Sequence, residues 1–376
     1  MHVGLNLIYL VPREMSGLET YARELIPALL RARPELQITG FVNREAAADP
    51  LRDVVQTVVV PVYGRRRSSW VRGEQVLLPE RARRAGIDLL HSLASTAPAW
   101  GPFRRVVTIH DVIYRIHPEA HGWRTAAMRL LVPLAARRSQ RIIVPSETSR
   151  ADLVRVLGVS ASKIDVVPNG IGRAAPSAPL PEPDLRARYD LGARPLVSTL
   201  GLNRPHKNLR RLLDALALLP RERRPLLVVA GHPSPHEHEL RGYAAQIGVD
   251  ADTRFVGWLP EEALEALYRA STCFVFPSLY EGFGLPVVEA MARGVAVACS
   301  DRGALREVAD HAALTFDPER TDAIAAAIER LLADPAERER LSAAGRANAA
   351  RFTWDETARG TLQSYDAALA YSAATA

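Results

Sequence analysis

One feature constrains the fold of this chain more than any other: an alternation of two kinds of segment along nearly its whole length. Short apolar runs rich in β-branched residues, such as 3–10, 104–110 and 141–146, alternate with amphipathic stretches such as Thr20–Arg31. Strands that are apolar throughout and are each followed by a helix are typical of parallel sheets covered on both faces. The alternation starts again near residue 195. The sequence therefore predicts an α/β fold with two parallel sheets in tandem.

The chain of 376 residues is long enough for two domains. The segment 171–183 is rich in Pro, Ala and Ser and has no periodicity, which is typical of a linker. We predict an N-terminal domain of βαβ type over 1–173, a linker over 174–184 and a C-terminal domain of βαβ type over 185–356. Ligands bind beyond the carboxyl ends of parallel strands, so two such domains predict an interdomain cleft.

Charge is distributed unevenly along the chain. Residues 1–173 hold 25 Lys and Arg against 15 Asp and Glu, whereas the remainder holds 23 against 27. A basic half attracts anionic lipid, nucleic acid or a phosphorylated substrate. Nucleic acid is disfavoured because the basic clusters lack interleaved aromatic residues. Two interpretations stay open: an Arg-rich solvated surface, or contact with a membrane or an anionic acceptor through Arg65–Arg67 and Trp70.

Cysteines and apolar runs bear on the compartment. Cys273 and Cys299 lie in apolar, β-branched runs, which favours small buried hydrophobic residues over a disulfide. No apolar run reaches the roughly 18 residues of a membrane span. The opening run 3–11 lacks a positive leader and predicts a buried strand. We expect a cytoplasmic protein, with peripheral attachment at the inner membrane face left open by its basic half.

The segment 274–294 carries the strongest indication of a site. A buried strand runs into a Gly-rich loop and then a helix opened by Pro286 and closed by Gly294, the expected asymmetry of a helix. Unpaired N–H groups at such a helix start can bind a phosphate or sugar hydroxyls. These groups belong to Phe283, Gly284 and Leu285.

Two carboxylates flank this loop and helix start. Glu281 and Glu289 stand eight positions apart in EGFGLPVVE, and both could reach one cleft wall to accept hydrogen bonds from hydroxyl groups. This segment resembles the signature of the retaining glycosyltransferases of family 4, whose GT-B architecture consists of two facing Rossmann-like domains. The resemblance implies that Glu281 contacts the transferred sugar and Glu289 the ribose of the nucleotide. Without that context, a turn residue and a solvated helix residue would be the simpler interpretation.

Two N-terminal segments resemble the same family. In MSGLETYARELIPALL the amide of Gly17 would lie by the donor phosphate, with Ser16 replacing the usual first glycine. Glu19 would either face the acceptor or favour the helix N-terminus. In VVTIHDVIYRIHPE the resemblance places His110 near the donor sugar, while Asp111 would cap the following turn. A metal site of these two residues with His117 is disfavoured, because no zinc-type spacing is present.

The segment 201–216, GLNRPHKNLRRLLDAL, resembles the family's phosphate-binding turn. Lys207 and an arginine would neutralise the diphosphate as negative charge develops on it. Many relatives place that arginine at the position of Leu202. Arg204 is the predicted replacement, and His206 is the alternative. The segment RFVGW would place Val256 and Gly257 beside the nucleobase, and the last helix, at about 357–376, would cross back to complete the first domain.

The resemblance implies a hexosyltransferase-like enzyme that moves a sugar from a nucleotide-diphosphate sugar to an acceptor hydroxyl on a glycan, lipid-linked saccharide or small natural product. It implies same-face attack without metal or cofactor, with catalytic roles for His110, Arg204, Lys207 and Glu281. A nucleotide-sugar epimerase or a non-catalytic nucleotide-sugar-binding protein on the same fold are the alternatives. A nicotinamide dehydrogenase is disfavoured because EGFGLP lacks the third glycine of the dinucleotide fingerprint. Acceptor specificity would lie in the loops 63–72 and 93–102.

Overall fold

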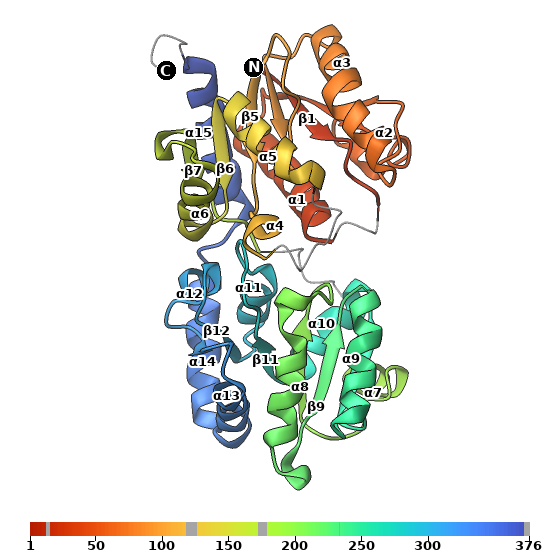
Figure 1. Cartoon of the computed structure of the whole chain (residues 1–376), viewed down its shortest axis with the longest axis vertical. Helices are drawn as coiled ribbons and strands as arrows, with labels where there is room; N and C mark the ends of the chain where they lie inside the picture. Colours follow the sequence, from red (N-terminus) through yellow and green to blue (C-terminus); the bar gives the residue numbers. More distant parts are fainter. Residues whose placement is uncertain (13–15, 118–125, 172–178, 233, 372–376) are drawn as a thin grey trace. The chain divides into compact units, whose positions relative to one another are not determined.

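The computed structural model describes residues 1–12, 16–117, 126–171, 179–232 and 234–371. The chain forms two compact units, shown in Figure 1. Unit 1 comprises Met1–Gly172 and Thr353–Ala376, and unit 2 comprises Arg173–Phe352. Each unit is a Rossmann-like domain built on its own parallel sheet, as the alternating pattern predicted. Within the described ranges, no helix has both the length and the apolar character that crossing a bilayer requires.

Unit 1 holds a seven-stranded sheet of order β3-β2-β1-β4-β5-β6-β7, and every pair of neighbouring strands is parallel. The chain order reverses between β1 and β4, which is the switch point where open α/β sheets bind ligands. The strands are β1 His2–Leu7, β2 Gln37–Val42, β3 Gln56–Val59, β4 Leu89–Ser92, β5 Arg104–Thr108, β6 Arg141–Val144 and β7 Ile164–Val166. The helices are α1 Ser16–Ala32, α2 Arg67–Arg72, α3 Leu78–Arg84, α4 Ile113–Ile116, α5 Ala126–Arg138, α6 Glu147–Leu157 and α15 Trp354–Ala370, with a π-helical turn at Gly73–Leu77.

The closing helix α15 belongs to the core of unit 1 and lies beside α1 (Figure 1). It starts at Trp354, a few residues before the predicted position, because the Thr353 hydroxyl caps it by accepting from the Glu356 amide at 3.2 Å. Its Tyr365 is fully buried in the main core cluster of the unit. Ion pairs from α1 and its C-terminal end also reach α15, for example Arg33 to Asp366 at 2.8 Å. The last described helix is therefore an integral layer of unit 1.

Unit 2 holds a six-stranded parallel sheet of order β10-β9-β8-β11-β12-β13, with its switch point between β8 and β11. The strands are β8 Leu196–Leu200, β9 Leu226–Ala230, β10 Thr253–Gly257, β11 Ser271–Phe276, β12 Val297–Ser300 and β13 Leu314–Phe316. The helices are α7 Glu182–Arg188, α8 Leu209–Leu218, α9 Pro235–Gln246, α10 Glu261–Ala270, α11 Leu285–Ala292, α12 Ala304–Ala309, α13 Thr321–Ala333 and α14 Pro335–Ala349.

The predicted linker 174–184 differs from the structure at its C-terminal end. Residues 174–178 lie outside the described ranges, but Glu182 already begins α7. Proline fits the first turn of a helix because its missing N–H would be unpaired there anyway. Pro183 lies in the first turn of α7 and Pro181 precedes the helix as its N-cap, while Leu185 of the same helix is buried against α10. Residues 182–184 of the predicted linker are thus part of α7.

Both cysteines are buried and free, as the sequence predicted. Cys273 lies in β11 and Cys299 in β12, two neighbouring strands of the unit 2 sheet. Burial raises the pKa of each thiol to about 12. Both side chains are therefore neutral packing groups near pH 7.

Candidate active site

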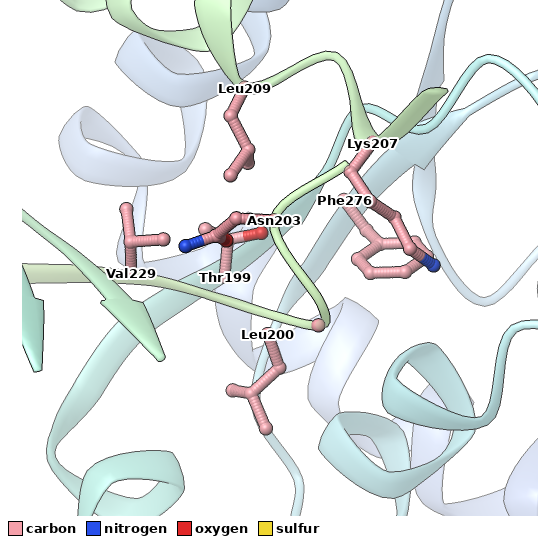
Figure 2. Close-up of a pocket in the computed structure, with 8 residues that line it drawn as sticks. Thr199, Leu200, Asn203, Lys207, Leu209, Val229 and Phe276 are labelled. Carbon is pink, nitrogen blue, oxygen red and sulfur yellow. The ribbon is translucent and has the colours of Figure 1, made fainter. Parts of the chain in front are cut away.

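A small pocket lies at the carboxyl end of β8 in unit 2, next to β11 across the switch point of the sheet. It is lined by Thr199, Leu200, Gly201, Asn203, Lys207, Leu209, Val229 and Phe276 (Figure 2). These residues come from the ends of β8, β9 and β11 and from the turn that leads into α8. The pocket thus occupies the place where ligands of open α/β sheets bind.

Lys207 and Glu281 are in direct contact. The Lys207 Nζ lies 2.5 Å from the Glu281 Oε1, and the two side chains are only 16% and 13% exposed. The same Nζ lies 5.1 Å from the centroid of the Phe276 ring, and Figure 2 shows the ammonium group beside that ring. A cation that is partly buried between a carboxylate and an aromatic face is held in place. The structure therefore brings together two residues that the sequence predicted for one site.

The turn that carries Lys207 is held by close backbone packing. Gly231 has φ 150°, and a Cβ added there would lie 1.8 Å from the carbonyl oxygen of Gly201. Only glycine allows the segments after β8 and β9 to approach this closely. The Asn203 Nδ2 donates to Glu237 Oε2 at 2.8 Å, and the Ser234 hydroxyl donates to the Asn203 carbonyl. The turn is therefore tied to the N-terminal part of α9.

Arg204 and His206, the two candidates for the second cation, differ in exposure. Arg204 is half-buried and begins the 3₁₀ turn Pro205–Lys207. His206 is only 7% exposed, and its carbonyl accepts from the Leu279 amide at 2.8 Å, so its backbone joins the turn to the loop after β11. Of the two, Arg204 is the more exposed residue. Leu202, at the family's arginine position, is half-buried.

The predicted anion site lies at the start of α11. Gly284 begins this helix with φ 104°, and a Cβ there would come within 2.5 Å of the Leu305 Cδ2. The dihedral angle favours glycine at this position, and any side chain there would also force Leu305 to shift. Phe283 is 5% exposed and packs edge to face on Phe352, with ring centroids 5.5 Å apart. Leu285, the first helical residue, completes the set of three predicted amides at this helix end.

Glu289 lies on α11, where its carboxylate is half-buried. The Tyr268 hydroxyl, which comes from α10, donates to Glu289 Oε2 at 3.0 Å. Tyr268 was not predicted from the sequence, because a tyrosine on an amphipathic helix gives no sign of what its hydroxyl binds. At the predicted nucleobase position, half-buried Val256 and Gly257 end β10, and Gly257 has φ 70°.

In unit 1 the predicted residue His110 follows β5. Its Nε2 lies 2.9 Å from the Leu93 carbonyl oxygen. A carbonyl can only accept, so Nε2 carries the proton and Nδ1 is left as an acceptor in the neutral ring. Burial lowers the pKa of His110, which keeps the ring neutral near pH 7. The Asp111 carboxylate accepts from the Ile113 amide at 3.0 Å, which confirms its predicted role in the turn.

Glu19 and Gly17, two of the residues in the N-terminal family-like segment, both lie on α1. Glu19 is 5% exposed and accepts from Arg23 at 2.8 Å, and Arg23 also binds Asp49 at 2.7 Å. Glu19 is thus part of an ion-pair network, a role that neither proposed interpretation contained. Gly17 is exposed in the first turn of α1, and a Cβ there would meet nothing within 4 Å. Sterics alone do not require glycine at position 17.

Glu74, another residue that the sequence analysis missed, is buried in unit 1. It lies in the π-helical turn, where its Oε1 accepts from Asn6 at 2.9 Å and Thr96 at 2.8 Å, and its Oε2 accepts from Gln75 at 3.1 Å. Burial raises the pKa of Glu74 to about 7, although these hydrogen bonds favour the charged form.

Across the described ranges, no group of three or more His, Cys, Asp or Glu side chains could hold a metal ion.

Comparison with solved structures identifies the architecture. The fold resembles sucrose-phosphate synthase from Thermosynechococcus elongatus with a TM-score of 0.78 and 23% identity, covering 97% of this chain and 98% of that one. It also resembles Anabaena HepE in complex with UDP and glucose, with a TM-score of 0.75 and 18% identity over 97% of this chain and 99% of that one. Two Rossmann-like domains with these neighbours define a GT-B glycosyltransferase fold.

Sequence comparison then gives the family. The model "Glycosyltransferase Family 4" matches residues 15–175, and the model "Glycosyl transferases group 1" matches residues 184–348. The O-antigen chain mannosyltransferase B of Escherichia coli is 33% identical over 274 residues, which is 70% of each chain. The chain belongs to the group 1 glycosyltransferases of family 4.

Proposed function

We propose that this glycosyltransferase transfers a mannosyl unit from a nucleoside-diphosphate donor to an acceptor hydroxyl, with retention of anomeric configuration. The Lys207–Glu281 pair at the carboxyl ends of β8 and β11 is the observation that carries this proposal. The name of the Escherichia coli relative supports mannose as the sugar. A nucleoside-diphosphate donor is supported by the UDP and glucose held by the Anabaena neighbour.

Donor binding would exchange the partners of the ion pair. The diphosphate would bind the Lys207 ammonium, and Glu281 would be released to accept hydrogen bonds from the sugar hydroxyls. Each charge therefore keeps a partner, which matters because an unpaired charge in a partly buried site is costly. Arg204 and the amides of Phe283–Leu285 would add donors to the phosphate oxygens.

The remaining predicted contacts follow from the resemblance. Glu289 would accept from the ribose, and Val256 and Gly257 would lie beside the base. For Gly17 and His110 of unit 1, contacts with the donor phosphate and sugar remain predictions.

The reaction would break the bond between the anomeric carbon and the phosphate oxygen, and the electron pair would leave with the diphosphate. Lys207, Arg204 and the helix amides would stabilise the developing negative charge. The acceptor oxygen would bond to the anomeric carbon on the same face, and its proton would pass to the leaving phosphate. Glu281 would orient the sugar and need not act as a nucleophile.

The test uses purified protein with a panel of nucleoside-diphosphate sugars and hydroxyl acceptors. We expect an α-linked product from an α-linked donor. The one-bond coupling between the anomeric carbon and its hydrogen, read from the NMR spectrum of the isolated product, gives the configuration. An inverted product would contradict the retaining mechanism but would not affect the proposal that the donor is a nucleoside-diphosphate sugar. A control without acceptor separates transfer from epimerisation, because an epimerase would convert the donor sugar by itself. Donor that changes into an epimer in that control would contradict the proposal.

A further inference from the structure

Tyr268 connects the second carboxylate of the EGFGLPVVE segment to the interior of unit 2. Its side chain is fully buried, and its hydroxyl donates to Glu289 Oε2 at 3.0 Å. Burial raises the pKa of the phenol well above its ordinary value, and the nearby Glu289 charge raises it further. Tyr268 therefore stays protonated and is a permanent donor to the carboxylate.

A second set of contacts holds the Tyr268 ring in place. The Arg293 guanidinium carbon lies 4.9 Å from the ring centroid, and Arg293 Nη1 donates to the backbone carbonyl of Glu289 at 3.0 Å. Arg293 Nε donates to Glu265 Oε2 at 2.5 Å, and the Glu265 side chain is 2% exposed. Arginine does not lose its charge at any ordinary pH. The same guanidinium therefore contacts the tyrosine ring, the backbone of Glu289 and a buried counter-ion.

We propose that Tyr268, held by Arg293 and Glu265, is a positioning residue that fixes the Glu289 carboxylate for donor binding. This inference rests on the proposed function, in which Glu289 accepts from the ribose hydroxyls of the nucleotide. A carboxylate can accept about four hydrogen bonds, so the bond from Tyr268 does not by itself saturate Glu289. Fixing one carboxylate oxygen beforehand removes rotamer freedom that binding would otherwise have to remove.

The arrangement also predicts specificity for a ribose. The Tyr268 bond fixes the orientation of Glu289 Oε2, so discrimination between ribose and deoxyribose should depend on the phenolic hydroxyl. A site built to bond a hydroxyl rejects the analogue that lacks it, because its polar groups are left unpaired. Tyr268 would act on this discrimination through Glu289 and would not touch the reacting atoms.

The experiment compares Tyr268→Phe with wild type for binding of nucleoside diphosphates and of their 2′-deoxy and 3′-deoxy forms. The probe is whichever of UDP, GDP and ADP binds wild type most tightly. Loss of one hydrogen bond to a charged group should raise the Kd of the ribonucleotide and the donor KM about tenfold, with kcat nearly unchanged. The Kd ratio of deoxy to ribo forms should fall toward one.

Tyr243→Phe is the matched control. The Tyr243 hydroxyl donates to Asp214 Oδ1 at 2.5 Å on another surface of unit 2, so this variant loses the same kind of bond. It should bind nucleotides as wild type does. A purely structural effect of Tyr268→Phe would lower the melting temperature and weaken ribo and deoxy forms equally, which would overturn the proposal.

Two further variants keep the test decisive. In a Glu289→Ala background, Tyr268→Phe should add no further loss of nucleotide affinity; an independent loss would overturn the inference.

If Tyr268→Phe does not fold, Arg293→Lys replaces it, because lysine keeps the charge but cannot make the same planar contacts. This variant should also lower the deoxy-to-ribo ratio, and an unchanged ratio would contradict the inference. Wild type that binds no nucleoside diphosphate would instead contradict the proposed function.

Discussion

The ammonium of Lys207 and the carboxylate of Glu281 lie 2.5 Å apart although 74 positions separate them in the chain. Lys207 follows β8 and Glu281 follows β11, and these strands are neighbours in the unit 2 sheet. Parallel neighbours end at the same edge of a sheet, so the turns after them meet. In the candidate site, the Glu281 carboxylate and the phosphate of a bound donor would therefore compete for the Lys207 ammonium.

Lys207→Ala tests the cation of this pair. Removing it should weaken binding of nucleoside diphosphates about 10- to 100-fold, the range expected for a lost hydrogen bond to a charged group. Isothermal titration calorimetry provides the measurement. The chain has one other lysine, Lys163, whose ammonium donates to backbone carbonyls in unit 1 at 3.1 and 3.2 Å. Lys163→Ala is the control and should keep wild-type affinity; wild-type affinity in Lys207→Ala would refute the phosphate assignment.

Glu281→Gln tests the carboxylate, and its effect on nucleoside diphosphate affinity should be opposite to that of Lys207→Ala. Since Glu281 competes with the diphosphate for Lys207, its neutral replacement should tighten nucleoside diphosphate binding a few-fold. Turnover should fall sharply, because the variant loses a charged contact to the sugar in the transition state. Calorimetry and initial rates with the preferred donor measure the two effects. Weaker diphosphate binding in this variant would speak against competition within the pair.

Gly284→Ala tests the helix start at the candidate anion site. The φ of 104° and the approach of a Cβ to within 2.5 Å of Leu305 should together destabilise the protein by about 2 kcal/mol. Gly242 in α9 is the matched control, because a Cβ there meets nothing within 4 Å. Alanine at that helical position should be neutral or stabilise by about 0.5–1 kcal/mol. Equal melting temperatures of the two variants would show that the strain argument is wrong.

Glu74 should make stability depend on pH. Burial raises its pKa from 4.5 to about 7, so the folded state binds this proton more tightly than the unfolded state. Its stabilising contribution is complete below pH 4.5 and is lost as the pH rises through about 7. Between these limits the free energy of unfolding of wild type should fall by about 3 kcal/mol relative to Glu74→Gln.

Chemical denaturation at several pH values measures this difference. Glu80→Gln is the control, because Glu80 pairs with Arg83 and Arg84 at the surface and its pKa is lowered. That substitution should leave the slope between about pH 5 and 8 unchanged. A parallel pH profile for wild type and Glu74→Gln would show that the carboxyl does not hold its proton as described.

Transfer should not require a divalent cation. An Asp-x-Asp triplet does occur at 250–252, but it directly precedes β10 and so lies at the amino end of that strand. Its Asp252 is bound by Arg194 at 2.6 Å and Arg224 at 3.3 Å. We therefore expect turnover to survive EDTA, measured with the preferred donor. Loss of activity that magnesium or manganese alone restores would contradict this expectation.

The alternating pattern was sufficient to predict two parallel sheets, because strands buried on both faces leave an unmistakable apolar run. The placement of Glu281 and Lys207 in one site could also be predicted from the sequence, since both residues follow strands and both belong to family-like motifs. Side-chain contacts between elements that lie far apart in the sequence could not be predicted. The bond from Tyr268 to Glu289 joins α10 to α11, and the bond from Arg23 to Asp49 joins α1 to a residue 26 positions away, so no local pattern encodes either contact.

The return of α15 to unit 1 has a consequence for biosynthesis. Gly170 lies where the chain leaves unit 1, and a Cβ there would come within 2.5 Å of the Trp354 backbone nitrogen, where the chain returns. Unit 2 is thus an insertion whose two ends are adjacent. A ribosome releases all of unit 2 before it releases α15, so unit 2 can complete its core while α1 and its sheet still lack their final helix. Nascent unit 1 must wait with an uncovered apolar face until α15, Trp354–Ala370, has been synthesised.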